Sequence, residues 1–207
     1  MLSPLRLDID PLPTDPLALD LDLVKTHLRV VVNDEDALIV NAIYGEVQAA
    51  EGSMHRAIVA RAHRWVLRRF PAGADPALRL PRGKTQSVAG IAYVSGGATT
   101  ALTGPTSGSP AGTDYQEDLR GDDGGVLLPP AGQSWPTVDA DVPAPVTITF
   151  TAGWTPAAIP QDIVAGLLLA IGNRFDIRSA LDLQAAETRA DPVEALFSGR
   201  RLTRWYA

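Results

Sequence analysis

Residues 146–178 read VTITFTAGWTPAAIPQDIVAGLLLAIGNRFDIR, and this stretch decides the fold class of the chain. Its first five residues alternate between large apolar side chains and threonine, which is typical of a half-buried strand. Pro160 suits the first turn of a helix, where its missing N–H costs nothing, and Asp162 suits the positive end of the helix dipole. The residues that follow place a wide apolar face on that helix: Ile163, Leu167, Leu168, Ile171 and Phe175. A strand that leads into a buried helix near 160–178 indicates an α+β protein.

The residues upstream of this stretch predict a β-rich elaboration over 56–155. Short apolar runs between 78 and 151 are separated by Gly- and Pro-rich turns such as SGG and GDDGG. Residues 83–85 are Gly-Lys-Thr, but a phosphate-binding loop needs another glycine where Leu78 stands, and Pro81 removes a backbone N–H. The triplet is therefore a lead-in to the alternating strand SVAGIAYV. The periodicity of residues 55–70 fits a helix and a strand equally well.

The N-terminal part predicts an arm followed by two helices. Residues 1–18 are rich in Pro and Asp, which favours a flexible arm, and residues 19–30 have apolar side chains at helical spacing. We expect Asn33 to cap a second helix by accepting from the N–H of Asp36, and Gly52 to end it. Residues 19–55 and 156–180 then form a helical core, and residues 181–207 a linker and a C-terminal tail.

The composition is that of an ordinary globular chain with an uneven charge distribution. The net charge is −6, yet residues 56–84 carry eight Lys or Arg against one acid, and residues 1–55 carry ten acids against three Lys or Arg. Separation of acidic and basic residues along the chain favours self-association or binding of an acidic partner. The alternative is that the arginines only form a solvated face. The start lacks the charge and apolar run of a signal peptide, and no apolar run is long enough to span a bilayer. We expect a soluble protein with no membrane partner.

Catalytic and metal-binding patterns are missing. The chain has no cysteine, so disulfides and thiolate metal sites are not available, and it has no Gly-x-Ser-x-Gly motif. None of its three histidines, His27, His55 and His63, has a second His or acid at metal-ligand spacing on a shared helix face. The acids around 117–123 lack the spacing of a calcium loop and are interpreted as solvated turn residues. We therefore expect no enzyme activity and no cofactor.

Taken in order, the segments resemble the head–tail connector proteins, also called adaptor or head-completion proteins, of long-tailed bacteriophages and gene transfer agents. The resemblance spans roughly residues 20–204. It rests on DLVKTHLRV, NDEDALIVNAIYGEVQAAEG, AIVARAHRWVLRRFP, LRLPRGKTQSVAGIAYV, the stretch 146–178 and PVEALFSGRRL. The arginine density of 56–69, the loop GPTSGSPAGTDYQEDLRGDDGG and the arm 1–18 have no counterpart in the family pattern, which leaves the partner contacts open.

The resemblance implies a function in assembly and favours a strand for 56–69. Such a protein forms a ring, of twelve copies, between the portal and the tail, with a tail-side stopper or terminator protein beneath it. The ring extends the channel for double-stranded DNA, whose sequence it does not read, and its subunits associate through apolar helix faces. The protein would be made in the bacterial cytoplasm and end in the neck of the particle. Phage and gene transfer agent are not distinguished.

Two groups of residues are candidate contact sites. An aromatic and basic C-terminal segment would bind the portal, because arginine and aromatic residues are enriched at interface hot spots; the alternative is a tail folded back on its own helix. It comprises Phe197, Arg200, Arg201, Leu202, Arg204, Trp205 and Tyr206. A second group would touch DNA phosphates in the channel: Arg56, Arg61, Arg64, Arg68 and Arg69. The competing hypothesis is a standalone DNA-binding or packaging-associated protein that uses these arginines.

Overall fold

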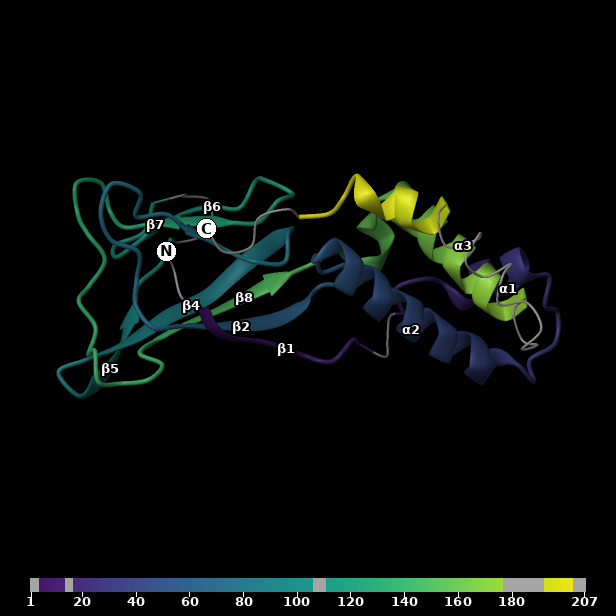
Figure 1. Cartoon of the computed structure of the whole chain (residues 1–207), viewed down its shortest axis with the longest axis horizontal. Coiled ribbons are helices and arrows are strands. Elements are labelled where there is room, and N and C mark those ends of the chain that lie inside the picture. Colours follow the sequence, from purple (N-terminus) through teal and green to yellow (C-terminus); the bar gives the residue numbers. More distant parts are fainter. Residues whose placement is uncertain (1–3, 14–16, 106–110, 177–191, 203–207) are drawn as a thin grey trace. The chain divides into compact units, whose positions relative to one another are not determined.

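The computed structural model describes residues 4–13, 17–105, 111–176 and 192–202. The chain divides into two compact units, each assembled from segments that are distant in the sequence. The strand unit comprises residues 1–11, 60–153 and 202–207, and the helical unit comprises residues 12–59 and 154–201. Helices and antiparallel sheets together form the α+β fold that the sequence predicts (Figure 1).

Two antiparallel sheets form the strand unit. The larger has the order β1-β2-β8-β4-β5, with bounds Pro4–Ile9, Arg61–Leu67, Val146–Ala152, Thr85–Ser95 and Ala98–Leu102. The smaller has the order β3-β7-β6, with bounds Leu78–Arg79, Val126–Leu128 and Gln116–Asp118. Each sheet contributes fully buried side chains, among them Trp65 and Phe150 from the larger and Leu127 from the smaller.

The ambiguous segment 55–70 contains a strand, as the family resemblance favoured. β2 pairs with β8 in an unbroken antiparallel register that sets Trp65 opposite Ile148 and Arg64 opposite Thr149. Because side chains alternate across a strand, Trp65 and Ile148 share the buried face, and Arg64 lies on the other face. One short segment thus supplies both core residues and surface arginines.

Part of the expected N-terminal arm is a strand. Residues 4–9 form β1, which pairs antiparallel with β2 over Arg6–Ile9 and Val66–His63. Pairing with a segment more than fifty residues away satisfies the backbone groups that a free arm would leave to water. Pro4 is the first residue of the strand and the other described prolines, Pro11 and Pro13, follow it, so no proline lies inside the regular pairing Arg6–Ile9.

The Gly-Lys-Thr triplet leads into β4, as the sequence predicts. Thr85 is the first residue of the strand, and its buried hydroxyl accepts from the N–H of Gly125 at 2.9 Å and donates to the carbonyl of Gly83. The far end of β4 turns through Gly96 and Gly97, whose φ angles of 60° and 75° are those of a tight hairpin turn. The Ser-Gly-Gly turn signal is therefore confirmed.

The helical unit contains α1 (Leu21–Leu28), α2 (Asp36–Met54), the 3-10 turn η1 (Pro156–Ala158), α3 (Gln161–Asp176) and a further helical segment at 192–198. Its core joins one face of α2 to one face of α3, and these side chains are nearly or fully buried: Ile39, Ile43, Val47, Ile163, Leu167 and Ile171. The buried face predicted for α3 is confirmed.

Both predicted boundaries of α2 are wrong. The Asn33 side chain does not cap the helix; it accepts from Lys25 Nζ at 2.7 Å, and Asp36 N–H donates to the Asn33 carbonyl instead. The helix also continues past Gly52 to Met54, whose side chain is fully buried. Burial of a Met side chain stabilises by more than the roughly 1 kcal/mol that a glycine costs inside a helix.

Candidate assembly surfaces

The C-terminal segment expected to be exposed is packed, up to residue 201, onto the helical unit. Phe197 is only 4% exposed and belongs to the helical core, so the expectation that it lies free at the surface is wrong. The Phe197 ring packs against Gly166 of α3: a Cβ on Gly166 would lie 2.6 Å from Phe197 Cε1. The missing side chain at Gly166 provides the space for the phenyl ring.

Arg200 fixes the segment through a charged pair. Its Nε and NH2 donate to the two carboxylate oxygens of Asp162 at 2.7 and 3.1 Å, in the bidentate geometry that makes such pairs strong. Arg56 Nε donates to the Arg200 carbonyl at 2.9 Å. Burial alone would raise the pKa of Asp162, but the hydrogen bonds and charge of Arg200, with the N–H groups of Ile163 and Asp162, outweigh it and lower that pKa.

Arg201 adds contacts to α2. Its guanidinium donates to the carbonyl and the hydroxyl of Ser53 and pairs with Glu194. Leu202 is half-buried. The remaining candidates, Arg204, Trp205 and Tyr206, lie outside the described residues. Arg200 and Arg201 thus engage their own unit, as in the folded-back alternative, and portal binding by the segment stays a prediction.

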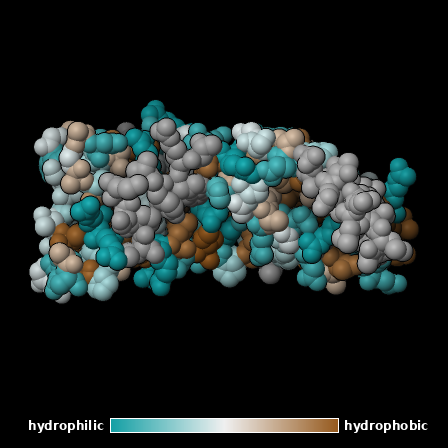
Figure 2. Space-filling model, in the orientation of Figure 1, coloured by the Kyte–Doolittle hydropathy of each residue, from teal (hydrophilic) through white to brown (hydrophobic). Residues whose placement is uncertain are grey.

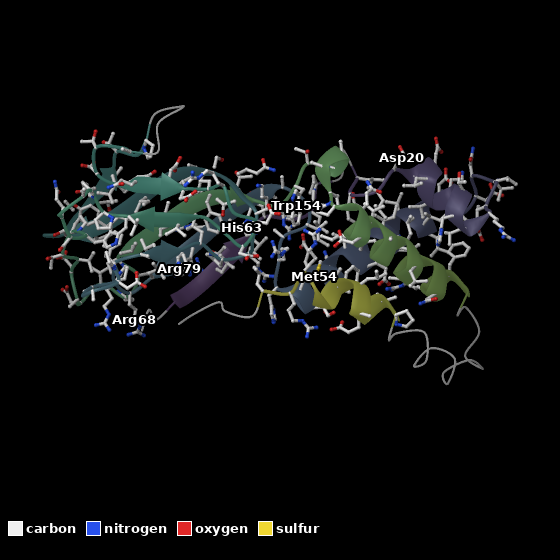
Figure 3. The ribbon with its side chains drawn as sticks, turned by 90° about the horizontal axis from the view of Figure 1, so that it is seen from above. Asp20, Met54, His63, Arg68, Arg79 and Trp154 are labelled. Atoms are coloured by element: carbon white, nitrogen blue, oxygen red, sulfur yellow. The ribbon has the colours of Figure 1, made fainter. Side chains whose placement is uncertain are left out.

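The arginines of 56–69 do not form one surface. Arg56 is 3% exposed and lies over the Trp154 ring, 5.8 Å from its centroid, so its expected place on a basic surface is wrong (Trp154 is labelled in Figure 3). Burying a guanidinium requires partners, and the Arg200 carbonyl and the indole face supply them. Arg61 is half-buried, whereas Arg64, Arg68 and Arg69 are exposed, with Arg68 at the surface of the strand unit in Figure 3. The basic surface thus reduces to three side chains.

Net charge differs between the units. The segments of the strand unit hold ten Lys or Arg and ten Asp or Glu, whereas those of the helical unit hold eight and fourteen. The excess negative charge of the chain therefore belongs to the helical unit. A unit with no net charge can touch phosphates locally through Arg64, Arg68 and Arg69, but it has no strong positive field to attract nucleic acid from a distance.

A surface that sequence analysis missed lies where α1 connects to α2. Four large apolar side chains are exposed there, a group called here the corner patch: Leu23 (44%), Val31 (92%), Val32 (52%) and Leu38 (52%). They come from α1, the connection and the first turn of α2, which the 2.7 Å bond from Lys25 Nζ to Asp36 Oδ1 ties together. The sequence feature that could have indicated it is the run Val30-Val31-Val32, three consecutive apolar residues that continue past the end of α1. Figure 2 shows hydrophobic residues on its visible face in separate patches between hydrophilic ones.

The helical unit also holds a cavity of about 320 Å³ between α2, α3 and residues 192–198. Small side chains line much of it, together with Phe197 and the carboxylates of Glu46 and Glu194. Those carboxylates pair with Arg174 (2.9 Å) and Arg201. Among the described lining residues, both carboxylates are therefore neutralised by arginine partners.

Two acids of the turn beside β6 are held in ion pairs. Asp118 binds Arg120 through both oxygens, and Asp122 pairs with Lys84 at 3.2 Å. The Arg120 hydrogen bonds lower the pKa of Asp118 to about 2. Among the described residues, no group of three or more His, Asp or Glu side chains could hold a metal ion, and no helix is long and apolar enough to cross a membrane.

No family model and no curated protein sequence matches the chain. Solved structures of gene transfer agent (GTA) particles do. The chain is 20% identical, with a TM-score of 0.71, to a chain in the neck of an empty GTA particle computed with C6 symmetry, and the alignment covers 98% of both chains. A chain in the virion of a native GTA particle gives the same values. A chain in the neck of a native GTA particle computed with C12 symmetry is 18% identical, with a TM-score of 0.62, over 97% of this chain and 98% of that one. The chain therefore has the fold of a GTA neck protein, in agreement with the family that its sequence resembles.

Proposed function

We propose that the chain is a structural head–tail adaptor: a ring of twelve copies between the portal and the tail of a phage-like particle, which extends the DNA channel without catalysis. The observation that carries this proposal is the similarity in fold to GTA neck chains over nearly the whole of both chains. C6 and C12 symmetry in those necks supports a closed ring. Assembly begins in the cytoplasm and places the protein in the neck, next to a tail-side stopper or terminator.

The corner patch supports assembly through the helical unit. A side chain such as Val31, 92% exposed, gains little burial by folding, and several exposed apolar side chains in one region of the fold favour an interaction site there. Asp22 and Asp34, which are close to Leu23 and Val32 in the chain, are exposed, and this favours a partner with a basic rim.

The portal contact is proposed for the end of the chain. Because Phe197, Arg200 and Arg201 already bind the helical unit, the residues left to reach a portal are Leu202 and those beyond it. Truncation after Leu202 removes Arg204, Trp205 and Tyr206 and keeps Phe197, Arg200 and Arg201, so it separates the end of the chain from the packed segment.

The test is co-purification with the portal protein encoded near this chain, followed by electron microscopy. We expect a ring on the portal with the full chain, and loss of portal capture with residues 1–202. Val31→Asp is expected to abolish the ring, and Gln48→Asp, which adds the same charge at an exposed polar position of α2, to leave it intact. A full chain that never binds the portal would refute the adaptor function.

The second candidate function is a standalone DNA-binding or packaging-associated protein. Exposure of Arg64, Arg68 and Arg69 is the observation that favours it, and the same side chains would touch DNA in the channel of a ring. DNA binding by the lone chain that weakens with added salt, together with no portal binding, would favour this candidate.

A further inference from the structure

The larger sheet ends in two strands with open edges. β5 lies at one end of the order β1-β2-β8-β4-β5 and β1 at the other, and neither has a further strand neighbour among the described residues (Figure 1). Every pair in this sheet is antiparallel, so β1, β8 and β5 run in the same direction. A second copy of the sheet placed alongside in the same orientation would bring its β1 next to β5 in parallel.

The backbone of β5 has hydrogen-bonding groups directed outward at Thr99 and Ala101. A two-residue turn closes on a hydrogen-bonded pair, here Ser95 and Ala98, and hydrogen-bonded pairs then recur at every second residue. Val94, opposite Thr99, agrees with this phase, because its N–H donates away from β5 to the Pro145 carbonyl at 2.8 Å. The N–H and C=O groups of Thr99 and Ala101 therefore face the edge, which is open as far as Thr103, where both backbone groups bond to Asp114.

β1 presents the matching set. Asp10 N–H donates to the Ala62 carbonyl at 3.1 Å, so alternate residues before Asp10 also bond to β2. The backbone groups of Leu7 and Ile9 consequently point outward. Arg6 and Asp8 share one face and neutralise one another in an ion pair of 2.8 Å. The β1 edge is therefore neutral and carries the same two-residue repeat as the β5 edge.

The β5 edge lacks the features that keep sheet edges apart. Its sequence, Ala-Thr-Thr-Ala-Leu, has no charge and no proline, its register with β4 has no bulge, and residues 98–101 are all exposed. Natural edge strands are normally blunted by such features, because an open uncharged edge pairs with other chains. An edge left like this is suited to a strand partner.

We propose that β5 of one copy pairs in parallel with β1 of the next copy, so that the sheets join around the ring. The inference rests on the proposed ring. The contact is head-to-tail, with different surfaces on the two partners, which is the kind that closes into rings. Pairing of β5 with β5 would instead stop at a dimer and leave β1 open.

Disulfide trapping tests the pairing, because the chain has no cysteine of its own. Residues directly opposite each other in neighbouring strands share a sheet face. Asp8 pairs with Arg64, Arg64 with Thr149 and Thr149 with Gly90. Ala92, two residues after Gly90, pairs with Ala101, so Asp8, Thr99 and Ala101 lie on one face. We expect Asp8→Cys combined with either Thr99→Cys or Ala101→Cys to give an oxidised ladder of covalent oligomers from rings on the portal. Asp8→Cys with Thr100→Cys is the matched control, since Thr100 lies on the opposite face of the same strand and should give no ladder.

A second pair of variants tests the hydrogen bonds. Ala101→Pro removes one outward N–H and keeps the bonds to β4, which Thr100 and Leu102 make; proline is tolerated at such an edge position. Ala101→Val keeps the N–H. We expect the proline variant to fold but to lower ring yield about tenfold relative to the valine variant.

The outcomes separate this inference from the function on which it rests. Rings that form with no ladder from either cysteine pair, and with equal yields for Ala101→Pro and Ala101→Val, would overturn the edge pairing and leave the adaptor intact. Covalent dimers from Thr99→Cys alone would show β5–β5 pairing and overturn it as well. A wild-type chain that forms no ring on the portal would overturn both.

Discussion

Replacing Phe197 by alanine tests whether residues 192–201 belong to the helical fold. The side chain is 4% exposed and lies against Gly166 of α3, so its removal loses the transfer free energy of a buried phenyl group and leaves a void. Buried Phe→Ala changes cost about 3–5 kcal/mol. Phe197 already lines the 320 Å³ cavity, so part of the ring is not in close contact with other atoms and its removal loses less. We therefore expect a loss in the free energy of unfolding of about 3 kcal/mol, at the low end of this range.

The assay is urea unfolding followed by far-ultraviolet circular dichroism, which reports mainly on the helical unit. Leu196→Ala is the matched control, because Leu196 precedes Phe197 in the same helical segment but is 36% exposed; it should cost about 1 kcal/mol or less. If Phe197→Ala cost no more than Leu196→Ala, residues 192–201 would not be part of the fold. Phe197 would then return as a candidate for direct portal contact.

Three further changes test individual contacts. Glu51→Ala should cost about 1–3 kcal/mol in urea unfolding, because Glu51 accepts from two buried backbone N–H groups beyond α2, and Glu51→Gln, which keeps an acceptor, should cost less. The N–H groups of Gly97 and Gly96 hold the pKa of Asp139 below its usual 3.8. The stabilisation of the fold by Asp139 is therefore present above pH 3.8 and is lost as the pH falls through the folded pKa. An NMR titration gives that pKa, and urea unfolding of wild type and Asp139→Asn at several pH values gives the stabilisation. Gly166→Ala should destabilise by about 1–3 kcal/mol despite the better helix propensity of alanine, since its methyl group overlaps the Phe197 ring, and Phe197→Leu in the same background should recover part of the loss.

Sequence reasoning succeeded where the signal is local. The alternation of VTITF predicts β8, and Ser95-Gly96-Gly97 predicts the turn that the two positive φ angles confirm. These features depend on residues close in the chain, so periodicity and turn chemistry suffice. β1 is the contrary case, because its partner β2 lies more than fifty residues away and prolines around it suggest a free arm.

The candidate surfaces were harder to predict because exposure is a tertiary property. Phe197 and Arg200 in a basic, aromatic tail look available for a partner, yet Gly166 and Asp162 receive them on α3. Nothing near residue 197 in the sequence indicates that glycine. Val31 is the opposite case, an apolar side chain that the fold leaves 92% exposed.

The same reasoning limits how many arginines can contact DNA. Arg56 is buried against Trp154 and Arg61 is half-buried, so three of the five candidates remain: Arg64, Arg68 and Arg69. Each phosphate contact on duplex DNA contributes about −0.9 to the slope of log affinity against log salt. The lone chain should therefore show a slope no steeper than about −2.7 in fluorescence anisotropy with a short duplex, and changing all three residues to Gln should flatten it. A slope near −4.5 would require about five phosphate contacts, two more than these three arginines can make, and would refute this assignment.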